Sequence, residues 1–393
     1  MTRTNYSDGA PWLGKTPMSA AVKVGDVVFL GGHNAIDADG SVEYPGDVVA
    51  QTRLAFERLM FNLDQAGGSV DDIVDLMSFT ADPRQLSAVM EVGREFLPSG
   101  QEPAWTVAGS TGGVSPDALV TLRGIAVLGN GPKQCITPES SWWTGLPASA
   151  ACKKGDLVFV SGQVSVDAAG AIVQPGSHRG QADDAMAHVK ELLELAGGSL
   201  DDMLDMVSFH HDVRGMGDAA GAFETAFEGV SPSHAAALTT IGTPGLYSAG
   251  MMGSYRAIAD LSAGSRVARV PETVWWKKMP IAGVAKKESG SLVGIAGQVS
   301  SDGDGEILHS GDVRAQASYC LQQLNDGLEL LGGSIANIVE VTAFHKDPRD
   351  WELVTEVAAD VFGDERPAWT SIGTTGLYQE GYLHEIHALA VIE

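Results

Sequence analysis

A block of similar sequence occurs three times in this chain, and this repetition is what most limits how the chain can fold. The segment GDVVFLGGHNAIDADG at 25–40 returns as GDLVFVSGQVSVDAAG at 155–170 and as GSLVGIAGQVSSDGDG at 290–305. Further along, Gly68, Gly198 and Gly333 hold equivalent places, 130 and 135 residues apart. A repeat this long contains a whole small domain and is too long for a solenoid unit. We therefore predict three domains, at 1–130, 131–263 and 264–393.

The composition limits the partners and the compartment. The chain has 393 residues and a formal net charge of −25, because 50 acidic residues outnumber 25 Lys and Arg. Nucleic-acid binding needs clustered basic side chains, so we expect no nucleic-acid partner. No apolar run approaches the ~18 residues of a membrane span, so we expect no membrane partner either. The three cysteines form no CxxC motif and suit a reducing compartment, most simply the cytoplasm.

Each repeat shows the same order of predicted elements. Two β-like runs around a turn are followed by an amphipathic helix, which ends at a Gly-Gly pair such as Gly67-Gly68. A third β-like run then leads to a second helix, capped by an Asp-x-Arg motif as at 82–84. Two more strands close the unit. The order ββαβαββ predicts an α+β fold with two helices on one face of a sheet. Packing three sheets around a shared centre would bury the other faces. The stripe of the first helix is Val49, Thr52, Phe56, Leu59, Leu63 and Ala66.

Several motifs of the repeat resemble those of the RidA/YjgF family of reactive intermediate imine deaminases. They are the Ser-Gly-Gln at 161–163, the helix that ends in Gly-Gly-Ser, the Pro-Ala pairs at 103–104 and 367–368, and the last strand at 384–388. The resemblance covers almost the whole chain. It implies chorismate-mutase-like domains that form an intramolecular pseudo-trimer with a central β-barrel and clefts between the domains. It also implies a small-molecule substrate and no metal or other cofactor. We expect a monomeric pseudo-trimer or a low-order homo-oligomer.

The residues after Pro-Ala depart from the family pattern. Deaminases of the family hold the substrate carboxylate with an arginine at this place, whereas the present chain has Trp105 and Trp369. In the second repeat the aligned residue is Leu238 or His234. Tryptophan cannot replace the bidentate fork of arginine. We therefore predict that Trp105 and Trp369 form flat apolar walls for an aromatic or heterocyclic substrate.

The last strand of each repeat carries the next candidates. The family's glutamate survives only as Glu385, and the equivalent residues are Thr121 and Ser254. Two positions further along, on the same strand face, the residues are Arg123, Arg256 and His387. We predict that Glu385 activates water with help from His387 and that the two arginines contact the substrate; an exposed polar strand edge is the alternative.

Two further residues are candidates for substrate contact. His33 stands where the other repeats have glutamine, beside a strand that borders the family's cleft. Ser161 is the family's second-strand serine and has no evident base in the sequence. A metal site made from His210, His211 and His345 is the weaker interpretation, because the neighbouring aspartates are helix caps.

Two function classes follow. The first is a hydrolase or deaminase that acts on a C–N bond (imine, enamine or amide) of a small cyclic or aromatic metabolite in an inter-domain cleft. The second is a non-catalytic ligand-binding or scaffold protein in which the missing arginine reflects lost chemistry. Because Glu385 occurs in one repeat only, we expect the three clefts to differ.

Overall fold

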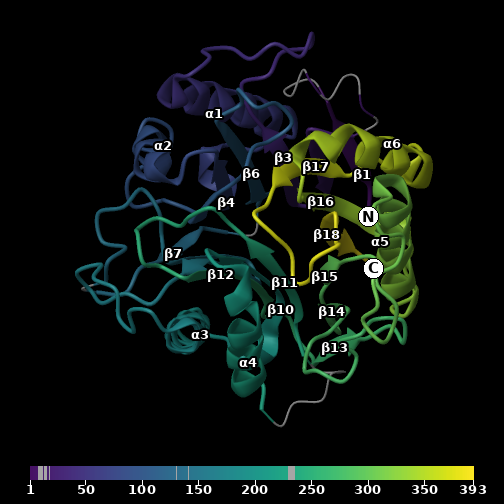
Figure 1. The fold of residues 1–393 in the computed structure, drawn as a ribbon. Helices are drawn as coiled ribbons and strands as arrows, with labels where there is room; N and C mark the ends of the chain where they lie inside the picture. Colours follow the sequence, from purple (N-terminus) through teal and green to yellow (C-terminus); the bar gives the residue numbers. More distant parts are fainter. Residues whose placement is uncertain (8–11, 13–15, 17, 130, 140, 229–234) are drawn as a thin grey trace.

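The computed structural model describes residues 1–7, 12, 16, 18–129, 131–139, 141–228 and 235–393. In this part of the chain, three units of the same architecture are arranged around a centre (Figure 1). His234, one of the two candidates for the arginine position, lies outside the described residues. None of the described helices has the length and apolar character that a bilayer span needs.

The three units have the same elements in the same order. Unit 1 contains β1 (Arg3–Tyr6), β2 (Ala21–Val24), β3 (Val27–His33), α1 (Val48–Gln65), β4 (Ile73–Thr80), α2 (Leu86–Gly93), β5 (Ala104–Gly109) and β6 (Val120–Val127). Unit 2 contains β7 (Gln134–Ile136), β8 (Ala151–Lys154), β9 (Leu157–Gln163), α3 (His178–Leu195), β10 (Met203–His210), α4 (Met216–Ala226), β11 (Ala237–Gly242) and β12 (Gly253–Asp260). Unit 3 contains β13 (Arg266–Arg269), β14 (Val284–Lys287), β15 (Leu292–Gln298), α5 (Val313–Glu329), β16 (Ile338–His345), α6 (Trp351–Phe362), β17 (Ala368–Gly373) and β18 (His384–Val391).

The predicted α+β class is confirmed, and each unit has one more strand than we predicted. The first sheet runs β1-β2-β3-β6-β4-β5, and the other two repeat this order. The last pair of each sheet, such as β4 and β5, is parallel and the other pairs are antiparallel. The additional edge strands β7 and β13 lie in the Gly- and Pro-rich segments between the repeats, which carry little strand pattern in the sequence.

Helix limits follow from local chemistry. The Asp47 side chain accepts a hydrogen bond from the N–H of Ala50 and so caps α1, and Gly67 with φ +82° ends this helical segment. The second helix of the unit is preceded by a 3₁₀ turn, which begins where Asp82 accepts from the N–H of Arg84. The predicted stripe of α1 is buried except for Val49, which is 38 % exposed.

The inner sheet faces meet at a pseudo-threefold axis. Three equivalent phenylalanines mark it, with ring centroids 5.8, 6.2 and 6.2 Å apart in pairs. The edge strands β5, β11 and β17 each also touch the next unit through a single parallel bridge, such as the one between Ala104 and Ser149. In the described residues the strands form three separate six-stranded sheets, and no closed barrel is found among them. One bridge per interface joins the sheets where a barrel would need a continuous ladder. The phenylalanines are Phe79, Phe209 and Phe344.

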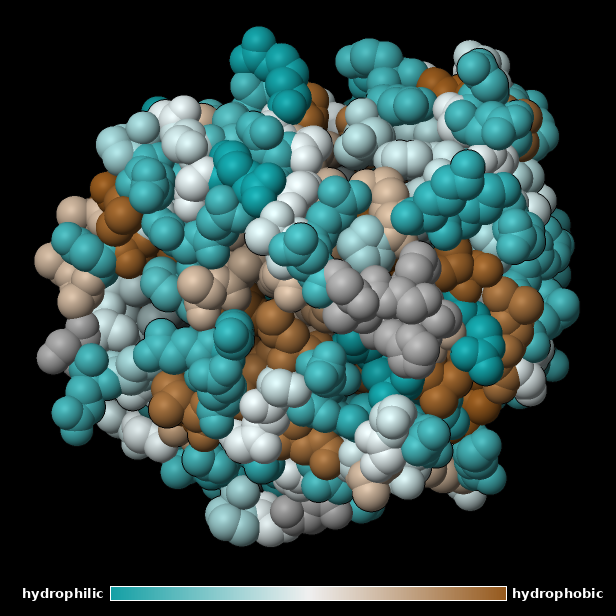
Figure 2. Space-filling model, turned by 90° about the horizontal axis from the view of Figure 1, so that it is seen from below, coloured by the Kyte–Doolittle hydropathy of each residue, from teal (hydrophilic) through white to brown (hydrophobic). Residues whose placement is uncertain are grey.

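The first and third units also meet, and this contact completes the ring. Arg3 in β1 donates hydrogen bonds to the backbone carbonyls of Ala336 and Ile338. The two ends of the chain lie close together beside α5, where the amino group of Met1 is paired with Glu393 (Figure 1). On the face seen in Figure 2, hydrophilic residues predominate and apolar residues show in several places.

Candidate functional site

Equivalent sites occur at the interfaces between units. At each one, a helix and an edge strand of one unit face the inner strands of the next. We name the interfaces by their units: 1/2 pairs β5 with β9, 2/3 pairs β11 with β15, and 3/1 pairs β17 with β3. The register of the parallel pairs aligns Ala104, Ala237 and Ala368, so that Leu238 holds the place of Trp105 and Trp369.

The 2/3 interface contains an apolar pocket with one carboxyl group. Its cavity has a volume of about 60 Å³. Unit 2 contributes Ala220 from α4 and Leu238 and Thr240 from β11, while unit 3 contributes the rest. No arginine or lysine occurs among the described lining residues. The unit 3 residues are Trp275, Trp276, Met279, Ile281, Gly297, Val299, Tyr378 and Glu385.

Glu385 is the only carboxylic acid among these residues, and its surroundings keep it protonated near neutral pH. Its side chain is 5 % exposed. Burial raises its pKa to about 8, and a hydrogen bond with the backbone of Thr240 opposes the shift only in part. The carboxyl group fits here because the neighbouring residue is glycine: a Cβ atom on Gly297 would lie 2.1 Å from Glu385 Oε1. A carboxyl group that titrates near the working pH can both give and accept a proton.

The same place in the 1/2 interface is filled by side chains. Its cavity measures only about 20 Å³. Here Trp105 replaces Leu238, Met90 replaces Ala220, and Ser254 replaces Glu385. The surrounding residues match, since Trp142, Trp143, Gly162, Val164 and Tyr247 correspond to Trp275, Trp276, Gly297, Val299 and Tyr378.

The 3/1 interface carries Trp369 and, in place of the acid, Thr121. The backbone of Trp369 packs so closely on β3 that a Cβ on Gly31 would lie 2.7 Å from the Trp369 nitrogen. A cavity of about 520 Å³ lies further out, between Trp12 and Trp351. Residues 13–15 and 17, close in sequence to Trp12, lie outside the described residues.

The structure does not bring Glu385 together with the predicted tryptophan walls. Trp105 packs edge-on against Phe56 of its own unit, and its Nε1–H donates to Ser78 Oγ at 3.2 Å. Trp369 donates in the same way to Ser371 at 2.9 Å. Neither tryptophan lines the 2/3 pocket. At each interface this position is contributed by the preceding unit, so the residue that faces Glu385 of unit 3 is Leu238 of unit 2. The aromatic walls beside Glu385 are instead Trp275 and Trp276.

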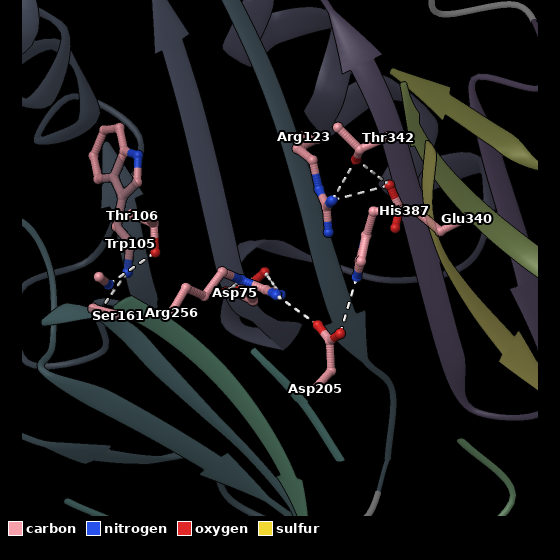
Figure 3. A network of polar contacts seen from close by, with 11 residues as sticks. Asp75, Trp105, Thr106, Arg123, Ser161, Asp205, Arg256, Glu340, Thr342 and His387 are labelled. Carbon is pink, nitrogen blue, oxygen red and sulfur yellow. Dashed lines mark hydrogen bonds and ion pairs between the residues drawn. The ribbon is translucent and has the colours of Figure 1, made fainter. Parts of the chain in front are cut away.

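Arg123, Arg256 and His387 lie at the centre of the molecule, in a ring of interdomain contacts (Figure 3). Arg256 holds Asp75 in the preceding unit with two hydrogen bonds, of 3.1 and 2.6 Å. Burial opposes the charge of Arg256, but the carboxylates around it, Asp75 foremost, outweigh this and raise its pKa.

The other two contacts complete this ring. Arg123 contacts Glu340 at 3.0 Å, and His387 Nε2 lies 3.0 Å from Asp205 Oδ1. All of these side chains are buried. None of the three basic residues lines the pockets described between units; each is paired with a carboxylate of another unit instead, so a substrate contact of Arg123 or Arg256 and help from His387 stay predictions. Glu385 and His387 lie on one face of β18, as their spacing of two residues predicted. Along this face, Glu385 lines the pocket, whereas His387 lies at the centre of the molecule and contacts Asp205.

Ser161 and His33 also have partners inside the protein. Ser161 Oγ accepts from the Trp105 backbone N–H at 2.8 Å and donates to the Ser149 carbonyl at 2.5 Å, so it joins units 1 and 2 (Figure 3). His33 contacts the carbonyl of Gly31 and the side-chain amide of Asn62, and burial lowers its pKa to about 4. Both side chains are fully buried, so contact with a substrate would require these bonds to break.

The histidines considered for a metal site are separated. His210 and His345 are equivalent residues in different units and contact Ser208 and Ser371. His211 points to the surface. Among the described residues, no group of three or more His, Cys, Asp or Glu side chains has an arrangement that could hold a metal ion.

Sequence reasoning missed most of the residues around Glu385. Trp275 and Trp276 line the pocket, and their indole nitrogens have no hydrogen-bond partner among the described residues. Ala220 and Tyr378 gave no signal alone. A comparison of the repeats at these positions would have shown that Ala220 takes the place of Met90. This exchange of a large side chain for a small one is the signal that one of the sites has more space.

Comparison with known proteins agrees with the threefold repeat. The family model described as Endoribonuclease L-PSP matches residues 13–128, 146–248 and 283–392, which is most of the chain. The chain belongs to this family, also called RidA/YjgF. The RutC family protein YjgH of Escherichia coli (strain K12) is 39 % identical over 94 residues, which are 24 % of this chain and 70 % of that protein.

Two further relatives extend the comparison. The 3-aminoacrylate deaminase RutC of Acinetobacter baylyi (strain ATCC 33305 / BD413 / ADP1) is 31 % identical over 110 residues, 28 % of this chain and 86 % of the relative. The crystal structure of a chorismatase matches with a TM-score of 0.57 and 14 % identity, and covers 81 % of this chain and 93 % of the other. At this identity the match shows a shared fold alone.

Proposed function

We propose that the chain is a hydrolytic enzyme of the deaminase type, with one working site at the 2/3 interface. It cleaves a C–N bond, in an imine, enamine or amide, of a small aromatic or cyclic compound, and Glu385 transfers the proton. One observation carries this proposal. The interface that retains the acid is also the one in which Trp and Met are replaced by Leu238 and Ala220, so the acid and the space coincide. If the protein had simply lost its activity, there would be no reason for the small residues Leu238 and Ala220 to occur at the one interface that retains Glu385.

The chemistry of the pocket selects the substrate. Trp275, Trp276 and Tyr378 provide flat apolar surfaces that suit an aromatic ring. The described lining holds no cation to pair with a carboxylate, and a second negative charge beside Glu385 would be costly in an apolar site. The substrate is therefore a compound without a carboxylate. The relative named 3-aminoacrylate deaminase supports the reaction class.

A balanced reaction uses Glu385 in both protonation states. For an imine, the protonated carboxyl group gives its proton to the nitrogen, and water then adds to the carbon as the carboxylate takes a proton from it. Collapse of this adduct breaks the C–N bond, and the hydroxyl proton leaves with the nitrogen as the C=O bond forms. One imine and one water thus yield one carbonyl compound and one amine, and Glu385 returns to its starting state.

Replacement of the acid tests the proposal. Imines of benzaldehyde are a suitable probe, with benzaldehyde release as the measurement. We expect Glu385→Gln to lower kcat by roughly 10²–10⁴-fold, as for loss of a general acid, while the affinity for the probe stays the same. Ser254→Ala, at the equivalent place in the 1/2 interface, is the matched control and should leave kcat unchanged. Binding without turnover in the unaltered protein, across imines, enamines and amides, would instead identify a non-catalytic binding protein.

A further inference from the structure

Two of the three cysteines face each other in unit 2. Cys135 in β7 and Cys152 in β8 are register partners on adjacent antiparallel strands. Both thiols are free, and a hydrogen bond joins their side chains. Cα atoms of directly opposite residues lie about 4.5–5.5 Å apart, within the range that a disulfide spans. Their Cβ atoms must come slightly closer for a bond to form. The three-residue edge strand β7 is the element that would move.

The surroundings give the two thiols different properties. Cys135 is half-buried at the sheet edge, whereas Cys152 is fully buried in the central core beside Phe159 and Leu204. The hydrogen bond from Cys152 does most to lower the pKa of Cys135 to about 7, and Ser149 and the nearby ammonium of Lys133 add to it, against the effect of burial. The same contact and burial raise the pKa of Cys152. Cys135 is thus the reactive thiol, and Cys152 lies within its reach.

The other two units lack this pair at the same place. The register partners equivalent to Cys135 and Cys152 are Asn5 and Val22 in unit 1 and Ala268 and Ala285 in unit 3. Neither position therefore requires a cysteine for the fold. The residue two positions before Cys135 has changed as well. Arg3 and Arg266 become Lys133, which still donates to a backbone carbonyl across the interface, that of Ile73 at 2.9 Å. A cation beside Cys135 is thus retained.

We propose that Cys135 and Cys152 are a peroxide-reactive dithiol that closes to a cross-strand disulfide. The Cys135 thiolate attacks one oxygen of hydrogen peroxide, which breaks the O–O bond and leaves a sulfenic acid and, after protonation, water. The Cys152 thiol then attacks the Cys135 sulfur, the S–S bond forms, and the hydroxyl group leaves with the thiol proton as a second water. In total, two thiols and one peroxide give one disulfide and two waters, and two electrons pass from sulfur to oxygen. This inference is independent of the proposed function.

Counting of free thiols after peroxide treatment of the full chain tests the inference. We expect three free thiols to fall to one, with a mass loss of two hydrogens and a peptide that links Cys135 to Cys152. Dithiothreitol should restore all three. Cys320 is the internal control, since it is fully buried in α5 and burial raises its pKa above the ordinary range. Three free thiols at a peroxide concentration that oxidises a low-pKa reference thiol would overturn the inference, as would sulfinic acid at Cys135 with no link.

Variants borrowed from unit 1 keep the test valid if a substitution disturbs packing. Cys152→Val places the unit 1 residue at the buried position and should leave Cys135 as a sulfenic acid that a dimedone probe captures. Cys135→Asn should leave Cys152 unreactive, because the buried thiol is then the only one of the pair. Rapid oxidation of Cys152 in the Cys135→Asn variant would show that the order of the two steps is wrong and overturn the assignment of Cys135 as the attacking thiol.

Discussion

The 1/2 and 2/3 interfaces are built on one plan and differ where chemistry would take place. Both have paired tryptophans, a tyrosine and a strand glycine at equivalent positions. Three of the positions at which they differ decide whether there is space and an acid. Trp105, Met90 and Ser254 fill the first site, and Leu238, Ala220 and Glu385 leave space and provide an acid in the second. The comparison teaches that the residues which pack the interface can stay the same while the residues that determine space and acidity change. The filled interface is therefore an internal control for the open one.

The largest expected effect tests the central contacts under the two interfaces. Arg256 spans the 1/2 interface with a bidentate bond to Asp75, whereas the 2/3 interface has the single contact of His387 with Asp205. Arg256→Met leaves a buried carboxylate unpaired and should cost about 3–5 kcal/mol of unfolding free energy. His387→Leu should cost less, about 1–3 kcal/mol, because Asp205 still lies 3.8 Å from Arg256. Urea denaturation measures both, and equal losses would contradict this ranking.

The next effect tests whether space at the 2/3 interface determines binding. Leu238→Trp introduces the residue that stands at this position in the other two interfaces and should weaken binding of benzaldehyde imines by roughly 10–100-fold, or about 1.4–2.7 kcal/mol. Trp105→Leu, the reverse change at the 1/2 interface, should leave binding unchanged and lower stability through a cavity. Isothermal titration calorimetry measures the affinities. Unchanged binding by Leu238→Trp would mean that ligands do not occupy this pocket.

The last effect concerns pH and distinguishes Glu385 from Ser254. Because the pKa of Glu385 rises from 4.5 to about 8 on folding, the folded chain holds a proton between these values that the unfolded chain has released. Stability from this group therefore falls as pH increases from 4.5 to 8 and is constant outside that window. Glu385→Gln should remove the decline, because the amide does not titrate in this range. Ser254→Ala should keep the decline. Melting temperatures across this pH range report it.

The sequence predicted the repeated scaffold well, because repeated features were seen three times. The helix stripe around Phe56, the Asp82 cap and the glycine at 67 depend on local periodicity and backbone conformation, which sequence carries directly. The short strand β7 was missed, since three residues between Gly- and Pro-rich stretches have little period of their own.

The candidate site was predicted only in part, because its composition depends on which unit lies opposite which. The alternation of side chains along the last strand predicted that Glu385 and His387 share a face. It could not show that His387 contacts Asp205 of another unit. Likewise, the sequence aligned Leu238 with Trp105 without showing that Leu238, from unit 2, faces the acid from unit 3. Contacts between units come from tertiary packing, which periodicity within one unit does not encode.

The covalent linkage of the three units has a consequence for dilution. When interfaces join separate chains, the sites between them vanish as the protein concentration falls below the dissociation constant. Here Arg3 of unit 1 contacts unit 3 within the same chain, and the units meet at an effective concentration of about millimolar, whatever the bulk concentration. The pocket around Glu385 therefore persists in a nanomolar solution, and its properties are those of a single molecule.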